Sequence, residues 1–533
     1  MAEEQAVAGP LVEPRPQAAA PAGPPPLQGT AIVLGTIALS LATFMNVLDT
    51  SIANVSIPSI AGDLGVSPDQ GTWVITSFAV ANAISMPLTG WLTRRVGQVR
   101  LFTASTLLFV LTSMLCGLAP TFSALVLFRA LQGLVAGPMI PLSQALLLSS
   151  YPKAKAGAAL GVWSMTTLVA PVVGPVLGGW ITDNISWPWI FYINVPVGVI
   201  AALVTWSVYR HRETLTTRLP IDKVGLGLLI LWVGALQILL DKGKDLDWFG
   251  SPVIVTLAIL AAVAFAVFLV WELTDKHPVV DLRLFKGRNF LVSSVAMSIG
   301  YGLYFGNVVL LPLWLQQYMG YTATLAGVIL APVGVLAIFL TPFVGRLVDR
   351  VDPRWFVTSS FVIFALVMFM RADFTTQADV DTLLLPTVIQ GAALATFFIP
   401  LLTLGFSGLA PERIASASGL LNFARISAGS FATSITTTLW DRRATLHHAQ
   451  LVERLVSNPQ AAQVMAQLHA EGLTTQQGNA LLNHLIDNQA YMMSTDDIFY
   501  VSGILFVAMI FLIWFARPAK AGASSAEVSA GAH

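Results

Sequence analysis

Charged residues are scarce in this 533-residue chain: Asp, Glu, Lys and Arg together make up 11% of it, against about 25% in a typical soluble protein. Hydrophobic residues make up 55%, so polar side chains are too few to cover a globule in water. The formal net charge is zero, which excludes a strong overall field that would attract nucleic acid. The main solvent of this chain is therefore lipid.

Cysteine and the common catalytic motifs are also missing. The single cysteine, Cys116, cannot form an intrachain disulfide. The chain has no phosphate-binding GxxxxGK[ST] motif, no zinc-binding HExxH and no GxSxG nucleophile turn. None of the seven histidines falls in a long apolar run. We therefore expect no enzyme activity, no metal, no other cofactor and no nucleic-acid partner.

Long apolar runs are what the sequence does contain. A helix needs about 20 apolar residues to cross a bilayer core of about 30 Å. Fourteen segments approach or exceed this length, at 30–58, 70–93, 99–119, 121–149, 157–182, 188–209, 224–240, 251–271, 290–318, 323–345, 355–370, 383–407, 414–440 and 498–516. We predict an all-α membrane protein with fourteen spans.

Lys and Arg are unevenly distributed between alternate loops. Nineteen of the 28 fall on one side, whereas the opposite short loops hold only Lys242, Lys244 and Arg371. Because Lys and Arg favour the cytoplasmic side, we predict that both termini are cytoplasmic. The Pro- and Ala-rich residues 1–28 and residues 517–533 are expected to be tails, the first of them disordered.

An internal repeat divides the predicted spans into two groups of six. MPLTGWLTRRVGQVR, from Met86, aligns with TPFVGRLVDRVDPR, from Thr341, at a spacing of 255 residues. Residues 30–209 and 290–516 would then be homologous halves, and 210–289 a linker carrying two inserted spans. Parallel repeats of this kind are typical of transporters that bind substrate between their halves.

Four motifs, in order, resemble those of the major facilitator superfamily. They are the loop motif Gly90–Gly97, the fourth-helix motif Leu127–Pro138, the fifth-helix antiporter motif Ala170–Gly179 and the first-helix motif Leu48–Pro58. The last resembles the 14-span drug:proton antiporter branch, and the resemblance extends over residues 28–517. It implies a major facilitator fold and proton-coupled multidrug efflux across the inner membrane.

Two features of these motifs suggest a gate. In the loop motif Gly90, Arg95 and Gly97 are present, but Arg94 stands where the family has an acid; the second copy, with Gly345, Asp349 and Arg350, keeps it. We therefore expect a charged latch in the second copy. The fifth-helix motif combines small residues every four positions with two prolines, which favours close helix packing and bending. Its proposed gating residues are Ala170, Pro171, Gly174, Pro175, Gly178 and Gly179. Close packing without gating is the alternative.

Ionisable groups inside the predicted spans are few, and each is costly to bury. They are Asp49, Arg129 and Arg425. Asp49 is the only carboxylate well inside a span, so we predict that it carries the transported proton. Arg129 or Arg425 would control its proton affinity, and the sequence leaves open which one pairs with Asp49. Purely structural roles remain the alternative for all three.

Polar and aromatic residues within the spans are candidates for substrate contact. They are Asn46, Asn54, Asn82, Gln144, Trp163, Tyr304, Phe305, Asn307 and Asn422. Asn307 lies 258 residues after Asp49, roughly its repeat equivalent without the charge. Packing or lipid contact is the alternative for any one aromatic.

Residues 441–497 form a predicted helical excursion between the last two spans. The family resemblance implies that such a segment meets a periplasmic membrane-fusion adaptor, which leads to an outer-membrane channel. The expected substrates are hydrophobic or cationic drugs, exchanged for protons. An uptake symporter and a membrane sensor that moves nothing remain alternatives.

Overall fold

The computed structural model describes residues 25–152, 155–217, 220, 222–275, 278–456, 470 and 474–518. All regular structure in these ranges is helical. This follows from the composition, because in lipid each backbone N–H and C=O must be bonded within the protein, and a helix achieves this within one segment.

The first half, residues 30–209, contains six spans or bent spans. Its helices are α1 (Thr30–Asp63), α2 (Pro68–Gly71), α3 (Trp73–Ser85), α4 (Thr89–Val96), α5 (Gln98–Gly117), α6 (Phe122–Ala136), α7 (Met139–Ser150), α8 (Ala156–Asn184), α9 (Trp189–Tyr192) and α10 (Asn194–Tyr209). Two inserted helices follow, α11 (Lys223–Lys242) and α12 (Pro252–Thr274). Short 3-10 turns, η2 (Trp248–Gly250) and η3 (Leu282–Lys286), adjoin them.

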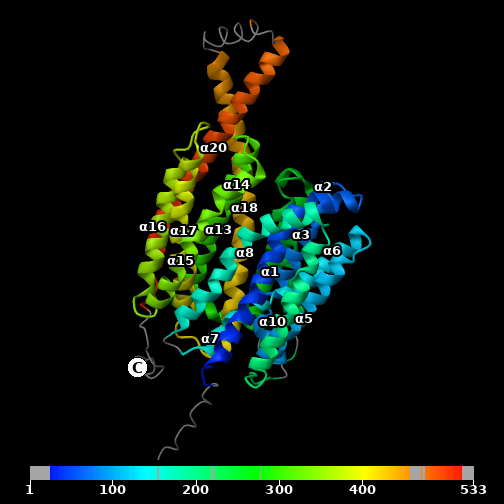
Figure 1. The fold of residues 1–533 in the computed structure, drawn as a ribbon, viewed down its shortest axis with the longest axis vertical. Helices are drawn as coiled ribbons and strands as arrows, with labels where there is room; N and C mark the ends of the chain where they lie inside the picture. The colour runs from blue at the N-terminus through cyan, green and yellow to red at the C-terminus, as the bar shows by residue number, and fades with distance from the viewer. Residues whose placement is uncertain are drawn as a thin grey trace, which may run out of the picture.

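The second half, residues 290–516, repeats the pattern. Its helices are α13 (Arg288–Gln317), α14 (Ala323–Leu330), α15 (Pro332–Leu347), α16 (Pro353–Arg371), α17 (Val380–Phe406), α18 (Pro411–Val456) and α20 (Thr475–Ile513). In Figure 1 the labelled helices α1, α3, α5, α6 and α10 lie on one side of the molecule and α13, α15, α16 and α17 on the other. Helices α8 and α18 lie between these groups.

Fewer helices than the fourteen predicted are long and apolar enough to count as membrane spans. Within the described residues eleven helices meet both criteria, and two bent pairs raise the number to thirteen. The bent pairs are Trp73–Ser85 with Thr89–Val96, at 62°, and Ala156–Pro171 with Val176–Asn184, at 45°. The predicted span 414–440 is helical but lies in α18, where serines and Arg425 lower the hydropathy. Several of these serines are buried, since α18 packs between the halves.

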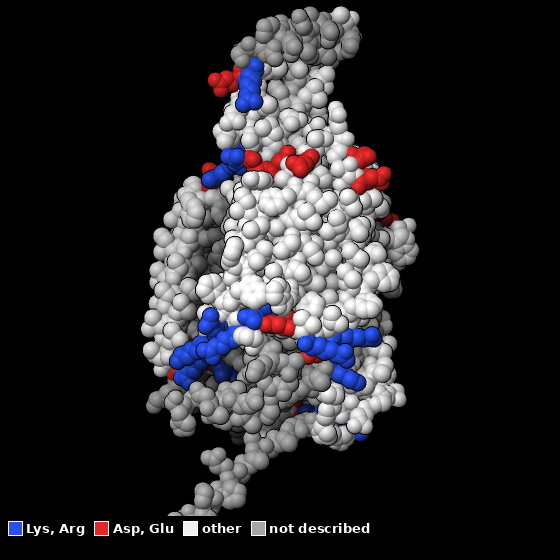
Figure 2. Space-filling model, turned by 90° about the vertical axis from the view of Figure 1, so that its left-hand side faces the viewer, with Lys and Arg blue, Asp and Glu red and all other residues white. Residues whose placement is uncertain are grey.

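Helices α18 and α20 extend beyond the other helices at one end and form a protruding stalk, which we define as residues 441–456 and 474–497 (Figure 1). On the face shown in Figure 2, Lys and Arg gather toward the opposite end, and an almost uncharged band separates them from the acidic residues near the stalk. We call this opposite end, which carries Arg94, Arg95, Arg346 and Arg350, the basic end. An uncharged band between charged ends is the expected surface of a membrane-spanning protein.

Candidate functional site

A buried ion pair lies in the middle of the first half. Asp49 of α1 accepts a hydrogen bond from Arg129 of α6, with 2.6 Å between Oδ2 and Nη1. The side chains of both residues are fully buried. The structure thus answers the question that the sequence left open: Arg129, and not Arg425, is the partner of Asp49.

Amide side chains complete the environment of the Asp49 carboxylate. Its Oδ1 atom accepts from Gln132 Nε2 at 3.1 Å and from Asn194 Nδ2 at 2.9 Å. Asn194 also donates to the hydroxyl of Ser113. Sequence reasoning missed these three residues because they are uncharged, although Gln132 lies one turn after Arg129. The site therefore joins four helices, α1, α5, α6 and α10.

The Arg129 guanidinium is held by further contacts. Its Nη1 donates to Gln132 Oε1 at 2.7 Å, and its Nε donates to the backbone oxygen of Val74 at 3.0 Å. The ring of Phe78 lies 4.3 Å from its central carbon, and that of Phe191 lies 5.5 Å away. A cation held over aromatic faces is stabilised even where water is absent. Asp49 thus faces an arginine with a fixed position.

Arg425 lies in a different environment on α18. Its guanidinium carbon lies 4.8 Å from the centre of the Tyr301 ring and 5.7 Å from that of Phe398. Within the described residues no carboxylate forms an ion pair with it, so the suggestion that it pairs with Asp49 is wrong. Sequence reasoning missed Tyr301 and Phe398, which a spacing pattern cannot distinguish from lipid-facing rings.

A second buried arginine corrects the sequence analysis. Arg371, assigned there to a loop, ends α16 and is only 1% exposed. One of its terminal nitrogens donates to Thr387 Oγ1 at 3.2 Å and to Gln390 Oε1 at 2.9 Å. No ion pair to a carboxylate is present for Arg371 in the described ranges.

The substrate candidates do not form one group. Five are buried and bonded to protein groups: Asn46, Gln144, Trp163, Asn307 and Asn422. Asn54 is exposed, and Asn82 is half-buried. The rings of Tyr304 and Phe305 both contact Tyr301, at 6.2 Å and 5.5 Å between centres. Of the substrate candidates, these two contact the same ring, Tyr301, that lies against Arg425.

The small-residue face of α8 packs closely on a neighbouring helix, as the four-residue spacing predicts. A Cβ added to Gly174 would lie 2.6 Å from the Ser51 Cβ, and one added to Gly178 would lie 2.9 Å from the Ile52 oxygen. Gly179 has only Val55 at 3.8 Å, so it lies off this face. The approaching helix is α1 of the same half, next to Asp49, and not a helix of the other half.

Ala170 and Pro171 precede this contact. Ala170 is fully buried, and the backbone oxygen of Pro171 accepts from Ser51 at 3.3 Å. The bend of α8 follows directly, between Pro171 and Val176, and includes Pro175. Prolines remove backbone donors and permit such bends.

The two halves meet at the basic end. A Cβ on Gly90 would lie 3.0 Å from the Cα of Ser416 in α18, and one on Gly345 would lie 2.8 Å from the Gly157 oxygen. Asp349 Oδ1 accepts from the Gly157 backbone N–H at 3.1 Å. The acid that the second motif copy retains therefore binds the start of α8 across the interface.

Deeper in the same interface, side-chain amides join the halves. Gln144 of α7 accepts from Ser418 and, at 3.2 Å, from Asn422, both of α18. The remaining motif residues lie nearer the surface: Gly97 has φ +98° and adjoins the Glu213 carboxylate, Arg95 lies over the Trp91 ring, and Arg350 is exposed.

Comparison with known proteins assigns the family. The model of the Major Facilitator Superfamily matches residues 39–433, which is more than half of the chain. The chain belongs to the major facilitator superfamily. It is a membrane transporter and not an enzyme.

Individual relatives are similar over nearly their whole length. The multidrug export protein EmrB of Escherichia coli K12 is 52% identical over 495 residues, which cover 92% of this chain and 97% of EmrB. The fatty acid resistance protein FarB of Neisseria gonorrhoeae is 49% identical, with 93% and 98% covered. Among solved structures, the proton:xylose symporter XylE matches with a TM-score of 0.56 at 14% identity, covering 91% of this chain and 95% of XylE. At that identity the likeness shows the fold alone.

Proposed function

We propose that this chain is a proton-coupled multidrug exporter of the inner membrane, with its basic end in the cytoplasm. The buried ion pair of Asp49 and Arg129 carries the proposal. An ionisable pair inside a membrane is retained for function far more often than for packing. The export function of the 52% identical EmrB supports the direction of transport.

Asp49 is placed to take up and release a proton. The carboxylate accepts three hydrogen bonds, two at Oδ1 and one at Oδ2, so Oδ2 keeps a lone pair that can take a proton. Protonation also removes the attraction to Arg129. Loading a proton would therefore loosen the contacts that join α1 to α6 and α10.

The path from Asp49 to the basic end runs through α8. Ser51 and Ile52, within one turn of Asp49, contact Gly174 and Gly178. The other end of α8, at Gly157, contacts Asp349 and Gly345 of the second half. We propose that a shift of α1 reaches the interface between the halves along this helix, which makes the small-residue face a transmitter of the gating movement.

Arg425 suggests which substrates fit in addition to hydrophobic and cationic drugs. A cation between the Tyr301 and Phe398 rings, with no carboxylate partner in the described part of the chain, suits an apolar molecule that carries an acidic group. Fatty acids, named for the 49% identical FarB, have this chemistry. We propose that amphipathic acids bind here.

The stalk suggests a partner outside the membrane. It projects beyond the other helices (Figure 1) and exposes Leu446, Leu481 and Leu485, which a docked protein would cover. We propose that it docks a periplasmic membrane-fusion adaptor, which continues to an outer-membrane channel. Replacing residues 445–493 by a Gly/Ser linker should spare transport in vesicles but abolish adaptor co-purification and resistance in cells. Normal co-purification would exclude the stalk as docking site.

Transport in everted membrane vesicles tests the proposed function. Drug should accumulate when a proton gradient is imposed and stop when an ionophore collapses it. Asp49→Asn should reduce this accumulation to the level of empty vesicles, whereas Asp63→Asn, an exposed acid at the end of the same helix, should not. Gradient-driven accumulation in Asp49→Asn would contradict proton coupling there. Movement in the opposite direction would indicate an uptake symporter, and no movement at all would indicate a sensor.

A further inference from the structure

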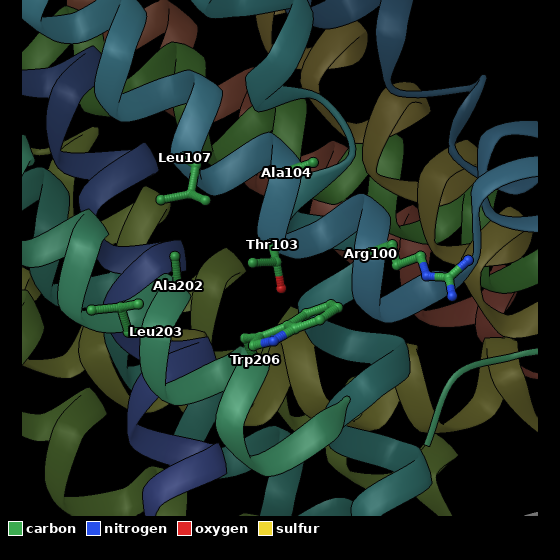
Figure 3. A pocket seen from close by; sticks show the side chains of 7 residues that line it. All are labelled: Arg100, Thr103, Ala104, Leu107, Ala202, Leu203 and Trp206. Atoms are coloured by element: carbon green, nitrogen blue, oxygen red, sulfur yellow. The ribbon is translucent and has the colours of Figure 1, made fainter. Parts of the chain in front are cut away.

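A groove on the outer surface of the first half lies apart from the ion pair and from the interface between the halves. It runs between α5 and α10 and has a volume of about 360 Å³, within the usual size of ligand pockets. Its lining is Arg100, Thr103, Ala104, Leu107, Ala202, Leu203 and Trp206 (Figure 3). Most of this lining is apolar, and the groove opens outward, where a membrane protein faces lipid.

Arginines mark one end of the groove. Arg100 stands at the basic end of α5 with its side chain 64% exposed, and Figure 3 shows it extending away from the apolar residues. Arg210 follows Trp206 by four residues, one helical turn, and is also exposed. Arg210 is not part of the groove lining, but this spacing places it on the same side of the chain as Trp206, beyond the end of the groove.

The protein neutralises only part of this charge. Glu213 forms an ion pair with Arg100 at 4.0 Å, and its carboxylate oxygens also accept from the backbone N–H groups of Val99 and Arg100 at 3.0 and 2.9 Å. Arg210 donates its Nε hydrogen to His211 Nε2 at 3.1 Å, not to an acid. The end of the groove thus keeps net positive charge at the membrane surface.

Trp206 lies between the charged end and the apolar floor. Indole rings favour the level of the lipid headgroups, where one side is apolar and the other is wet. Beyond it, Leu203 and Leu107 continue along the groove toward the centre of the membrane, both exposed. The order of arginine, tryptophan and aliphatic side chains matches the order of phosphate, glycerol and acyl chain in a phospholipid.

We propose that an anionic phospholipid occupies this groove, with its phosphate at Arg100 and Arg210 and one acyl chain along Thr103, Leu107 and Leu203. Charge complementarity selects an anionic headgroup over a zwitterionic one, because clustered basic residues near a membrane attract anionic lipid. Binding at this groove does not depend on whether the transporter couples export to protons.

Native mass spectrometry of the full chain, with added phosphatidylglycerol or phosphatidylcholine, tests this. The wild-type protein should retain phosphatidylglycerol more tightly than phosphatidylcholine. The double variant Arg100→Ala/Arg210→Ala should weaken phosphatidylglycerol retention roughly tenfold and phosphatidylcholine retention less, because that lipid carries a phosphate but no net charge. Arg346→Ala, which removes an exposed arginine at the same end but outside the groove, is the matched control.

A second variant tests the apolar part. Ala104 is exposed in the groove, so Ala104→Phe should fill it without disturbing the core and should weaken phosphatidylglycerol retention while both arginines remain. Inorganic phosphate at millimolar concentration should not displace the lipid. Unchanged retention in both variants, equal retention of the two lipids, or displacement by phosphate alone would overturn the proposal.

Discussion

The two halves contain the same polar layer with different charges. In the first half Asp49 of α1 pairs with Arg129 of α6, beside Gln132. In the second half the positions 258 residues later hold Asn307, Thr387 and Gln390. None of these three is an acid, and the buried arginine, Arg371 of α16, stands 258 residues after Ser113.

This difference assigns unequal tasks to two similar folds. The second half keeps a buried cation bonded to Gln390, as Arg129 is bonded to Gln132. It has no titratable acid beside that cation in the part of the chain that the structure describes. Only the first half can change its charge at this level, so we infer that proton binding acts there while the second half remains electrostatically fixed.

The two halves also differ in which helix of a close-packed pair carries the glycines. In the first half, glycines of α8 approach α1 at Ser51 and Ile52; in the second half, glycines of α13 approach α18. A Cβ on Gly302 would lie 3.1 Å from the Ala428 oxygen, and one on Gly306 would lie 2.6 Å from Thr436 Oγ1. Equivalent helix pairs are close in both halves, but the small residues lie on opposite partners.

Removing Arg129, the buried cation of the first half, should have the largest effect. Arg129→Met leaves Asp49 buried without its partner, which should destabilise the protein by about 3–5 kcal/mol and abolish transport. Adding Asp49→Asn should recover part of this stability, because no lone charge then remains. Melting temperatures in detergent for the two single variants and the double variant test this. A double variant as unstable as the sum of the singles would show that the residues do not interact.

Widening the α1–α8 contact should have the next largest effect. Gly178→Leu should cost about 1–3 kcal/mol through overpacking and should strongly reduce vesicle transport in a protein that still inserts. Gly179→Ala is the matched control on the same helix, since its added methyl meets only Val55. Equal transport rates for both variants would show that this face does not transmit movement.

The hydrogen bond from the Gly157 N–H to Asp349, which we call the latch, involves the second motif copy and not the first. Asp349→Ala leaves the Gly157 N–H without its acceptor, which should cost roughly 1 kcal/mol and speed hydrogen exchange in residues 155–161. Asp349→Asn keeps an acceptor and should preserve slow exchange. Arg94→Ala, in the first copy, should change exchange there little.

The same latch has a predicted pH dependence. Burial raises the pKa of Asp349 above its ordinary value, although the Gly157 N–H opposes this. A raised pKa means that the closed interface favours the protonated acid, so closure should strengthen as the pH falls through this pKa. Exchange rates at several pH values, corrected for intrinsic exchange, would show the opposite trend if the sign is wrong.

Removing Arg371, the buried cation of the second half, should have the smallest effect. Arg371→Met eliminates a buried charge that has no acidic partner in the described part of the chain, so the lost hydrogen bonds to Thr387 and Gln390 are largely offset. We expect stability within about 1 kcal/mol of the parent and transport that still depends on the proton gradient. A loss as large as that of Arg129→Met would remove the distinction between the halves.

The sequence predicted the features that depend on composition or short spacing. Charge scarcity predicted the membrane helices, and the spacing of Gly174 and Gly178 predicted a close helix contact. The lone intramembrane acid pointed to Asp49, which the structure places in a buried ion pair; its role in proton transport stays a prediction. It could not choose between Arg129 and Arg425, because that choice depends on which helices become neighbours. It placed Arg371 in a loop because its burial depends on how α16 packs against α17, which carries Thr387 and Gln390.

Proton release on drug binding tests the central claim most directly. A pH indicator in a weakly buffered solution of the purified protein reports protons displaced when a saturating drug is added. The wild-type protein and Arg371→Met should both release protons, whereas Asp49→Asn should bind the drug and release none. Release from Asp49→Asn equal to that of the wild-type protein would contradict the assignment of the transported proton to Asp49.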